Sequence, residues 1–232
     1  MEKRQKTCSS CETKYTIVWD IEEQDLEPLT CPFCGYEVED EQDETEEVCQ
    51  MTIVTKTIIG IDYSLTSPAV CVNIDGDAGL MFYYLTNKKK WTGTMSEEIV
   101  GYEHKEWTDP IERFKYISDF ALDIISPLLN PQIYIEGYSF GSKGQGLFQI
   151  AENCGILKYR LQEEQLPYAT VVPSVVKKGA TGKGNADKEM MYEAFVKETK
   201  LDLKKIFDTE KVGNPISDIA DSYFIQKVGY EN

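Results

Sequence analysis

Short apolar runs alternate with segments of helical periodicity along most of the chain. Apolar runs of strand length occupy residues 53–62, 68–74, 80–86, 133–137 and 168–172. Apolar side chains recur at helical spacing in residues 110–130, 147–161, 188–196 and 218–228. The pattern from Thr52 onward therefore predicts a mixture of strands and helices. Residues 199–212 are polar and fit neither period.

Two of the predicted strands end in a carboxylate. Asp62 follows the run Ile58–Ile61, and Glu136 follows Ile133–Ile135. A charge on a buried strand is costly unless a partner or a metal compensates it, although an aspartate can also simply begin a turn. Asp218 and Asp221, three residues apart, share one face of the last predicted helix. On a surface helix such a pair is unremarkable, but beside two strand-end carboxylates it suggests a metal site.

Four carboxylates from two strands and a helix can converge on hard divalent cations. Mg²⁺ prefers oxygen ligands and commonly links carboxylates to substrate phosphates. Two such ions can activate a water and stabilise the leaving oxygen in phosphodiester hydrolysis. No histidine, cysteine pair or serine triad in this part of the chain offers a competing chemistry, and the lone His104 lies in a polar stretch that is expected at the surface.

Four of the seven cysteines form two close pairs near the start of the chain. Cys8 and Cys11 are separated by 19 residues from Cys31 and Cys34. This spacing matches a four-thiolate structural zinc site, with free or redox-active cysteines as the alternative. Residues 1–36 are therefore predicted to form a zinc ribbon with one structural Zn²⁺, which stabilises a unit too small to fold on its core alone. Paired cysteines of this kind also favour a reducing compartment.

The net charge of −16 is unevenly distributed. Eight of the eleven residues from Glu37 to Glu47 are acidic, which predicts a flexible, solvated linker at residues 37–50. Residues 1–50 carry 4 basic and 15 acidic side chains, whereas residues 51–232 carry 20 and 25. Because phosphate affinity depends on where basic groups cluster, the negative total does not exclude DNA. No stretch approaches the ~20 apolar residues of a membrane span, so we expect a cytoplasmic protein with no membrane partner.

Two glycine-rich stretches carry the candidate DNA contacts. Residues 138–146 contain Tyr138, Phe140 and Lys143, but they lack the Gly-Lys-Ser/Thr end of a nucleotide-binding loop. Residues 173–188 set several lysines among glycines, an arrangement that lets backbone amides and ammonium groups approach phosphates. The lysines of this second stretch are Lys177, Lys178, Lys183 and Lys188.

Four motifs carry a family resemblance over roughly residues 55–230. They are Gly60–Ser64, Ile135–Gly137, Val175–Lys188 and Ser217–Ser222. In order and spacing they resemble the motifs of RuvC-type Holliday junction resolvases. The resemblance implies an α/β, RNase H-like nuclease domain at residues 51–232, with a five-stranded mixed sheet flanked by helices. It also implies a homodimer that nicks opposing strands of a four-way junction, a crossover junction endodeoxyribonuclease.

The resemblance also assigns roles to individual residues. By position, Asp62, Glu136, Asp218 and Asp221 would be the catalytic metal ligands for two Mg²⁺ or Mn²⁺ ions. Lys177 and Lys188 match the DNA-contacting lysines of the family.

The sequence departs from the family in two places and leaves two alternatives open. Ser139 stands where the family has its junction-opening aromatic residue, with Tyr138 and Phe140 on either side. The bacterial enzyme lacks a zinc ribbon and an acidic linker, which points to a virus- or phage-type variant in a bacterial host cytoplasm. One alternative is another RNase H-like nuclease, acting on flaps, branched replication intermediates or RNA–DNA hybrids. The other is a nonenzymatic DNA- or replisome-binding protein.

Overall fold

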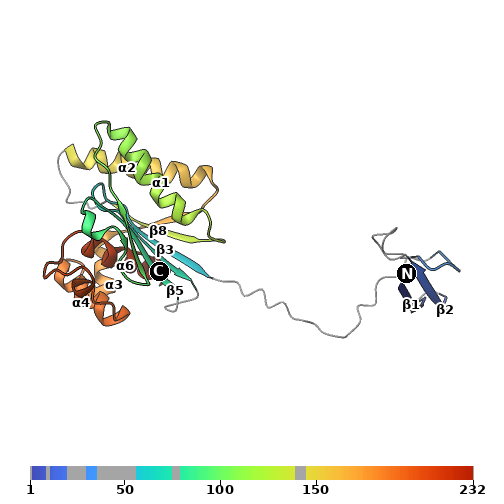
Figure 1. Ribbon diagram of the computed structural model, residues 1–232. Coiled ribbons are helices and arrows are strands. Elements are labelled where there is room, and N and C mark those ends of the chain that lie inside the picture. The colour runs from blue at the N-terminus through green and yellow to red at the C-terminus, as the bar shows by residue number, and fades with distance from the viewer. Residues whose placement is uncertain are drawn as a thin grey trace. The chain divides into compact units, whose positions relative to one another are not determined.

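The computed structural model describes residues 2–8, 11–19, 30–35, 56–74, 79–138 and 145–231. The chain divides into two units, Met1–Val54 and Thr55–Asn232 (Figure 1). Three sequence predictions lie outside the described residues: the acidic linker at 37–50 and the DNA contacts Phe140 and Lys143.

The first unit contains an antiparallel pair of strands, β1 (Glu2–Thr7) and β2 (Lys14–Trp19). Cys8 and Cys31 are buried, and Tyr15 of β2 packs against them. The buried groups of this small unit are thus mostly thiols.

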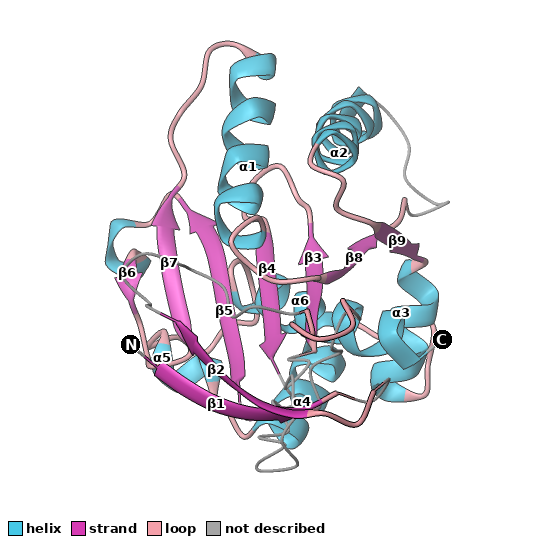
Figure 2. Ribbon diagram, turned by 90° about the vertical axis from the view of Figure 1, so that its right-hand side faces the viewer, coloured by secondary structure: helices cyan, strands magenta, loops and turns pink. Residues whose placement is uncertain are grey.

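The second unit is built on a mixed sheet of seven strands (Figure 2). Its strands are β3 (Thr57–Asp62), β4 (Ala69–Ile74), β5 (Gly79–Thr86), β6 (Gly93–Thr94), β7 (Ile99–Glu103), β8 (Gln132–Glu136) and β9 (Tyr168–Val171), in the spatial order β6-β7-β5-β4-β3-β8-β9. Five of them correspond to the strands expected from the sequence: β3, β4, β5, β8 and β9. The expected number of five strands was too small, because β7 and the two-residue β6 extend the sheet beyond β5.

Strand directions create one edge at which most strands end. β3 is parallel to β8, and β8 is parallel to β9. β4 is antiparallel to both β3 and β5, so β5 runs in the direction of β3, and β7 is parallel to β5. Strands β3, β5, β7, β8 and β9 therefore end at one edge of the sheet, called the carboxyl edge below.

Helices cover both faces of the sheet (Figure 1). On one face lie α1 (Pro110–Ile125) and α2 (Gln145–Glu163), and on the other lie α3 (Pro173–Thr181), α4 (Lys188–Thr199), α5 (Leu203–Ile206) and α6 (Ile216–Glu231). Strand β4 shows how one sequence serves both faces. Val70 and Val72 belong to the core under α1 and α2, whereas Ala69 and Cys71 belong to the core under α4 and α6. Alternation along the strand thus places apolar groups in two separate cores.

Two sequence expectations outside the sheet need correction. His104 was expected at the surface, but it is only 8% exposed, and its Nε2 atom lies 2.9 Å from Leu65 O. Residues 199–212, which matched no period, contain the short helix α5 and the fully buried Phe207, whose ring packs against Trp91. The 3-10 turn at Lys89–Trp91 is anchored there as well, because Trp91 Nε1 donates to Phe207 O over 3.0 Å.

None of the helices that the structure describes combines the length and apolarity of a membrane span.

Candidate functional site

The carboxyl edge brings Asp62 and Glu136 together. Ile61 of β3 pairs in parallel register with Ile135 of β8, so the next residue on each strand is the carboxylate that ends it. The two strand-end carboxylates therefore stand side by side on adjacent strands. This arrangement follows from the register alone, because parallel neighbours end at the same edge.

Helix α6 adds Asp218 and Asp221 by crossing very close to β3. A Cβ atom at Gly60 would collide with Ser222 O and lie 2.5 Å from Gln226 N, both in the backbone of α6. Only glycine allows the helix and the strand to approach this closely. Asp218 lies one helical turn before Ser222, so the same crossing carries the first turn of α6 towards Asp62.

The carboxylates act on one another electrostatically. Burial raises the pKa of Asp62 well above its usual value, and Asp218, Asp221 and Glu136 raise it further. Burial likewise raises the pKa of Asp221 to about 7, with Glu136 and Asp218 contributing. The pKa of Glu136 is raised to about 7 by burial, and that of Asp218 to about 6. Four carboxyl groups, of which Asp218 is buried and the other three are half-buried, repel each other and form a site that favours positive charge.

Two lysines lie beside this cluster. Lys188 Nζ donates to Ser217 Oγ over 3.1 Å and to Asn214 Oδ1 over 3.4 Å, and its charge lowers the pKa of Asp62, Asp218 and Asp221 against their burial. Lys177 acts in the same direction on Glu136 and Asp221. The structure thus brings together two of the four lysines predicted from the sequence with all four carboxylates.

The remaining predicted contacts lie further out. Lys178 and Lys183 are exposed at the end of α3 and in the turn after it. Tyr138 is 42% exposed and its hydroxyl lies 3.5 Å from Ala151 O.

The glycines of residues 173–188 have a different role from the one expected. They were expected to let a loop approach phosphate, but residues 173–181 form helix α3. Gly179 lies against α6, where a Cβ would collide with the side chain of Val228, and Gly182 ends the helix with a φ of 78°. Close helix packing and a left-handed helix end therefore account for these two glycines.

Sequence reasoning missed the hydroxyl and amide groups around the site. Ser217 Oγ donates to Asp218 Oδ1 over 3.2 Å, which lowers the pKa of Asp218 against the larger effect of burial, whereas the hydroxyl of Ser67 donates to Leu85 O over 2.9 Å. Asn214 Nδ2 donates to Thr66 Oγ1 over 3.4 Å, which links the turn before α6 to the loop after β3. Ser217 adjoins Asp218 in the sequence, but no sequence signal marks Ser67 or Asn214.

The donor set fits a hard divalent cation. Asp218 Oδ2 is buried and has no hydrogen-bond partner among the described residues. A buried carboxylate oxygen without a partner is costly, and a bound cation removes that cost. All the candidate ligands are carboxylate oxygens, which suits Mg²⁺ or Mn²⁺ better than a softer metal.

The first unit holds a second candidate metal site. One sulfur atom from each of Cys8, Cys11, Cys31 and Cys34 lies within 4.8 Å of the other three. None of the four is in a disulfide, and hydrogen bonding to the Thr13 side chain and backbone lowers the pKa of Cys11 to about 6. Four convergent sulfurs are the donor set of a structural zinc site, as the spacing predicted.

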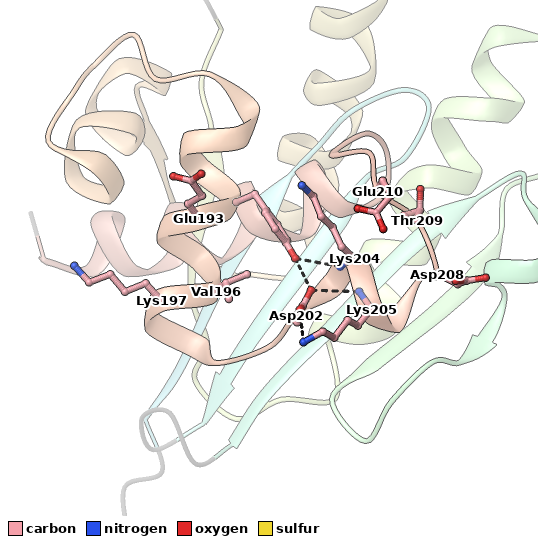
Figure 3. Close-up of a pocket in the computed structure, with 10 residues that line it drawn as sticks. Glu193, Val196, Lys197, Asp202, Lys204, Lys205, Asp208, Thr209 and Glu210 are labelled. Carbon is pink, nitrogen blue, oxygen red and sulfur yellow. Dashed lines mark hydrogen bonds and ion pairs between the residues drawn. The ribbon is translucent and has the colours of Figure 1, made fainter.

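A cavity of about 690 Å³ lies elsewhere, between α4 and the segment 202–210 (Figure 3). Three of its charged side chains form ion pairs. Lys205 pairs with Asp202 at 3.0 Å, and Lys204 pairs with Glu189 at 3.1 Å. Because hydrogen bonds from Tyr192 and Lys205 lower the pKa of Asp202, opposite to the raised pKa values of the carboxylate cluster, this cavity competes poorly with that cluster as a reactive site.

Comparison with protein-family models finds no match, and comparison with curated protein sequences finds none. Solved structures with a similar backbone were found. RuvC of Thermus thermophilus in complex with a Holliday junction substrate has a TM-score of 0.50 at 17% sequence identity, covering 75% of this chain and 92% of that chain. A second T. thermophilus RuvC structure gives a TM-score of 0.48 at 15% identity, covering 75% and 95%. The yeast mitochondrial Holliday junction resolvase Ydc2 gives 0.47 at 15% identity, covering 75% and 77%.

The likeness to the junction-bound RuvC structure shows that this chain has a RuvC-like fold. The α/β fold class expected from the sequence motifs is thereby confirmed.

Proposed function

We propose that this chain is a divalent-metal-dependent endonuclease that cuts four-way DNA junctions, a crossover junction endodeoxyribonuclease. The observation that carries the proposal is the convergence of Asp62, Glu136, Asp218 and Asp221 at the carboxyl edge, with a buried oxygen of Asp218 left without a partner. A solved structure of the same fold is RuvC in complex with a Holliday junction substrate.

The four carboxylates would hold two Mg²⁺ or Mn²⁺ ions. Such ions, when bound, supply Lewis-acid stabilisation of the charge that develops during phosphodiester hydrolysis. The protein itself positions the carboxylates and the basic groups beside them. Gly60 admits α6 to the sheet, and Ser217 orients the Asp218 carboxylate. Lys177 and Lys188 stand beside the cluster, where ammonium groups can contact the phosphates on either side of the bond to be cut.

We further propose that the protein works as a homodimer. Phe148 and Tyr159 of α2 are 70% and 62% exposed, and their separation of three helical turns places them on one face. Two exposed aromatic residues in line on one helix favour contact with a second copy of the chain. A second copy also supplies the second active site that cutting opposing strands of a four-way junction needs. The molecular mass by light scattering tests this, with Phe148→Glu expected to yield the monomer.

The domain arrangement completes the proposal. Residues 1–36 are a zinc ribbon with one structural Zn²⁺, residues 37–50 an acidic linker, and residues 51–232 the nuclease domain. We place the protein in the cytoplasm, where unpaired thiols persist.

The deciding experiment compares synthetic substrates of one sequence in Mg²⁺: a four-way junction, a flap, an RNA–DNA hybrid and a linear duplex. We expect symmetrically placed nicks in the junction and little cleavage of the other three. Equal or better cleavage of the flap or hybrid would assign the site to another RNase H-like nuclease. Binding of the junction without cleavage of any substrate would leave a nonenzymatic DNA-binding protein.

A further inference from the structure

A second, smaller pocket opens beside the carboxylate cluster. Its volume is about 360 Å³, which is ample for a tetrahedral phosphate group. The lining residues share a polar character: His104, Lys105, Glu106, Trp107, Arg113, Thr66 and Asn87. Most of these side chains offer N–H or O–H donors, and Glu106 is the only acid.

The pocket lies at the carboxyl edge. Asn87 directly follows the end of β5, and His104 directly follows the end of β7. Thr66 lies in the loop that follows Asp62 at the end of β3. Lys177 and Lys188 adjoin the carboxylates, and this pocket extends along the same edge to the ends of β5 and β7. A nucleic-acid strand that crosses the carboxylates can therefore meet basic groups at more than one place along this edge.

The positive charges of the pocket lack carboxylate partners. Arg113 is half-buried and donates from Nη2 to Leu65 O over 2.5 Å, but it makes no ion pair within the described part of the chain. The ammonium of Lys105 lies 5.2 Å from the centroid of the Tyr116 ring and also has no acidic partner there. A partly buried guanidinium is normally paired, so its environment calls for an anion.

Two further donors in the pocket wall are unsatisfied. Arg113 Nε and Trp107 Nε1 are buried and have no acceptor among the described residues. Their N–H dipoles add to the positive potential at the pocket, because nothing nearby neutralises them. A guanidinium with a donor to spare is suited to phosphate, which accepts hydrogen bonds in the same fork geometry as a carboxylate.

A shared carbonyl connects this pocket to the carboxylate site. Leu65 O accepts from Arg113 and lies 2.9 Å from His104 Nε2. The next residue, Thr66, accepts from Asn214 Nδ2 over 3.4 Å, and Asn214 lies in the turn before the helix that carries Asp218. The pocket residues thus hold a loop that contacts the turn before α6.

We propose that this pocket binds a phosphodiester group of the DNA substrate at a position away from the cleaved bond. The inference rests on the proposed nuclease function and adds a second position at which the protein holds a phosphate of the substrate. With one phosphate held here and another at the carboxylates, the strand direction across the carboxyl edge is set. The pocket therefore contributes to binding and positioning.

The test is phosphate-neutralisation interference on a four-way junction, with binding measured in Ca²⁺. Methylphosphonate, which is neutral, replaces one phosphate at a time. One position outside the cleavage site should weaken binding of the unchanged protein about tenfold. In Lys105→Gln and Arg113→Gln the same replacement should have almost no further effect, because the contact is already lost. Each variant should also lower the log–log salt slope by about 1.

Lys115→Gln is the matched control, since this lysine is 72% exposed on α1, the helix that also carries Arg113, and pairs with Asp119 at 2.7 Å. It should keep the full interference pattern. Lys105 is exposed, so its variant should keep the unfolding temperature of the unchanged protein even if Arg113→Gln disturbs the loop at Leu65. Unchanged affinity in Lys105→Gln and Arg113→Gln, or an interference pattern identical to that of the control, would overturn the pocket assignment alone. Failure to cleave any junction would instead overturn the nuclease proposal, and the binding measurement would still decide the pocket.

Discussion

At the scale of single residues, the carboxylate cluster brings together side chains whose negative charges repel one another. Burial and mutual repulsion raise the pKa of Asp62 and of the neighbouring carboxyl groups. The positive charges of Lys177 and Lys188 offset this rise in pKa only in part. Asp218 Oδ2 has no partner in the part of the chain that the structure describes. Such an arrangement lowers stability unless a cation occupies it, so the residues are better explained by chemistry than by folding.

Replacing any one carboxylate with its amide should abolish most cleavage and spare DNA binding. Asp62→Asn, Glu136→Gln, Asp218→Asn and Asp221→Asn each remove a negative ligand while keeping the side-chain shape. We expect a loss of at least ~3 kcal/mol in transition-state stabilisation, or ~100-fold in single-turnover rate. Junction affinity should hold or rise, because less negative charge faces the phosphates. Full activity of both Asp218→Asn and Asp221→Asn would refute the site.

The raised pKa values also predict a pH dependence of stability. A carboxyl group whose pKa is higher in the folded state binds its proton more tightly when folded. Its stabilising contribution is present below the unfolded pKa of about 4 and is lost as pH rises through the folded value. For Asp218 at about 6, and for Glu136 and Asp221 at about 7, the loss falls between about pH 4 and pH 7.

Protein freed of Mg²⁺ and Mn²⁺ should therefore have a lower unfolding temperature at pH 8 than at pH 5.5. Added Mg²⁺ should recover the difference at pH 8. Asp218→Asn is the control, because one titrating group is gone and the fall should be smaller. An equal fall in the variant would show that other groups cause it.

At the scale of elements, the crossing of α6 over β3 decides whether the site exists. The strand supplies Asp62, the helix supplies Asp218 and Asp221, and Gly60 sets the distance between the two backbones. The packing that stabilises α6, including the fully buried Ile219 and Phe224, is therefore also the packing that positions two candidate ligands.

Gly60→Ala should separate helix from strand. The added Cβ meets backbone atoms, which cannot rotate away, so we expect a loss of about 1–3 kcal/mol in unfolding free energy. Cleavage should fall further than stability alone explains, since Asp218 moves with α6. Gly213→Ala is the matched control, because a Cβ there has nothing within 4 Å. Denaturant unfolding and junction cleavage of both variants decide the matter, and a fully active Gly60→Ala would show that α6 tolerates the shift.

Elements that carry their own periodicity were predictable from the sequence, and elements fixed by distant contacts were not. The strands that end at Asp62 and Glu136 and the helix beginning at Pro110 follow from apolar runs and end signals. Strand β7 was missed because it is five residues long and merges into a polar stretch. Helix α5 was missed because Leu203 and Phe207 become buried only against residues far away in the sequence.

The sequence predicts a set of candidate site residues but not their surroundings. The carboxylates stand out because they interrupt apolar patterns, which is a local signal. His104 looked exposed because its neighbours are polar, yet its Nε2 atom lies 2.9 Å from Leu65 O, a carbonyl that only the folded chain brings near. The glycines near Lys177 suggested a phosphate loop because a glycine needed for helix packing looks the same in sequence as one needed in a turn.

At the scale of the whole molecule, the two units differ sharply in charge and in what stabilises them. Most of the net charge of −16 lies in residues 1–50, whereas residues 51–232 carry 20 basic and 25 acidic side chains. Among the described residues of the first unit, the buried cluster consists of two cysteines with a partly buried Tyr15, whereas the second unit has two apolar cores on either side of its sheet. The loss of one metal should therefore affect one unit only.

The first unit should bind one Zn²⁺ through Cys8, Cys11, Cys31 and Cys34. Metal analysis of protein purified without chelator should give one equivalent, and Cys8→Ser with Cys31→Ser should give none. If the metal supplies the stability of the first unit, removing the zinc should unfold that unit and leave the thermal transition of the second unit unchanged. Less than half an equivalent of zinc, with four free thiols at these positions, would contradict the assignment.

The position of α6 in the chain has a consequence for the time at which activity appears. Asp62 and Glu136 are synthesised early in the second unit, whereas Asp218 and Asp221 come with the last helix described. Ribosomes add about 5–20 residues per second, so a growing chain carries the strand-end pair for several seconds without the helix pair. Over that interval, and in any fragment cut before Ile216, at most half of the proposed ligand set is present. The proposed DNA-cutting activity would thereby be withheld until α6 has been added.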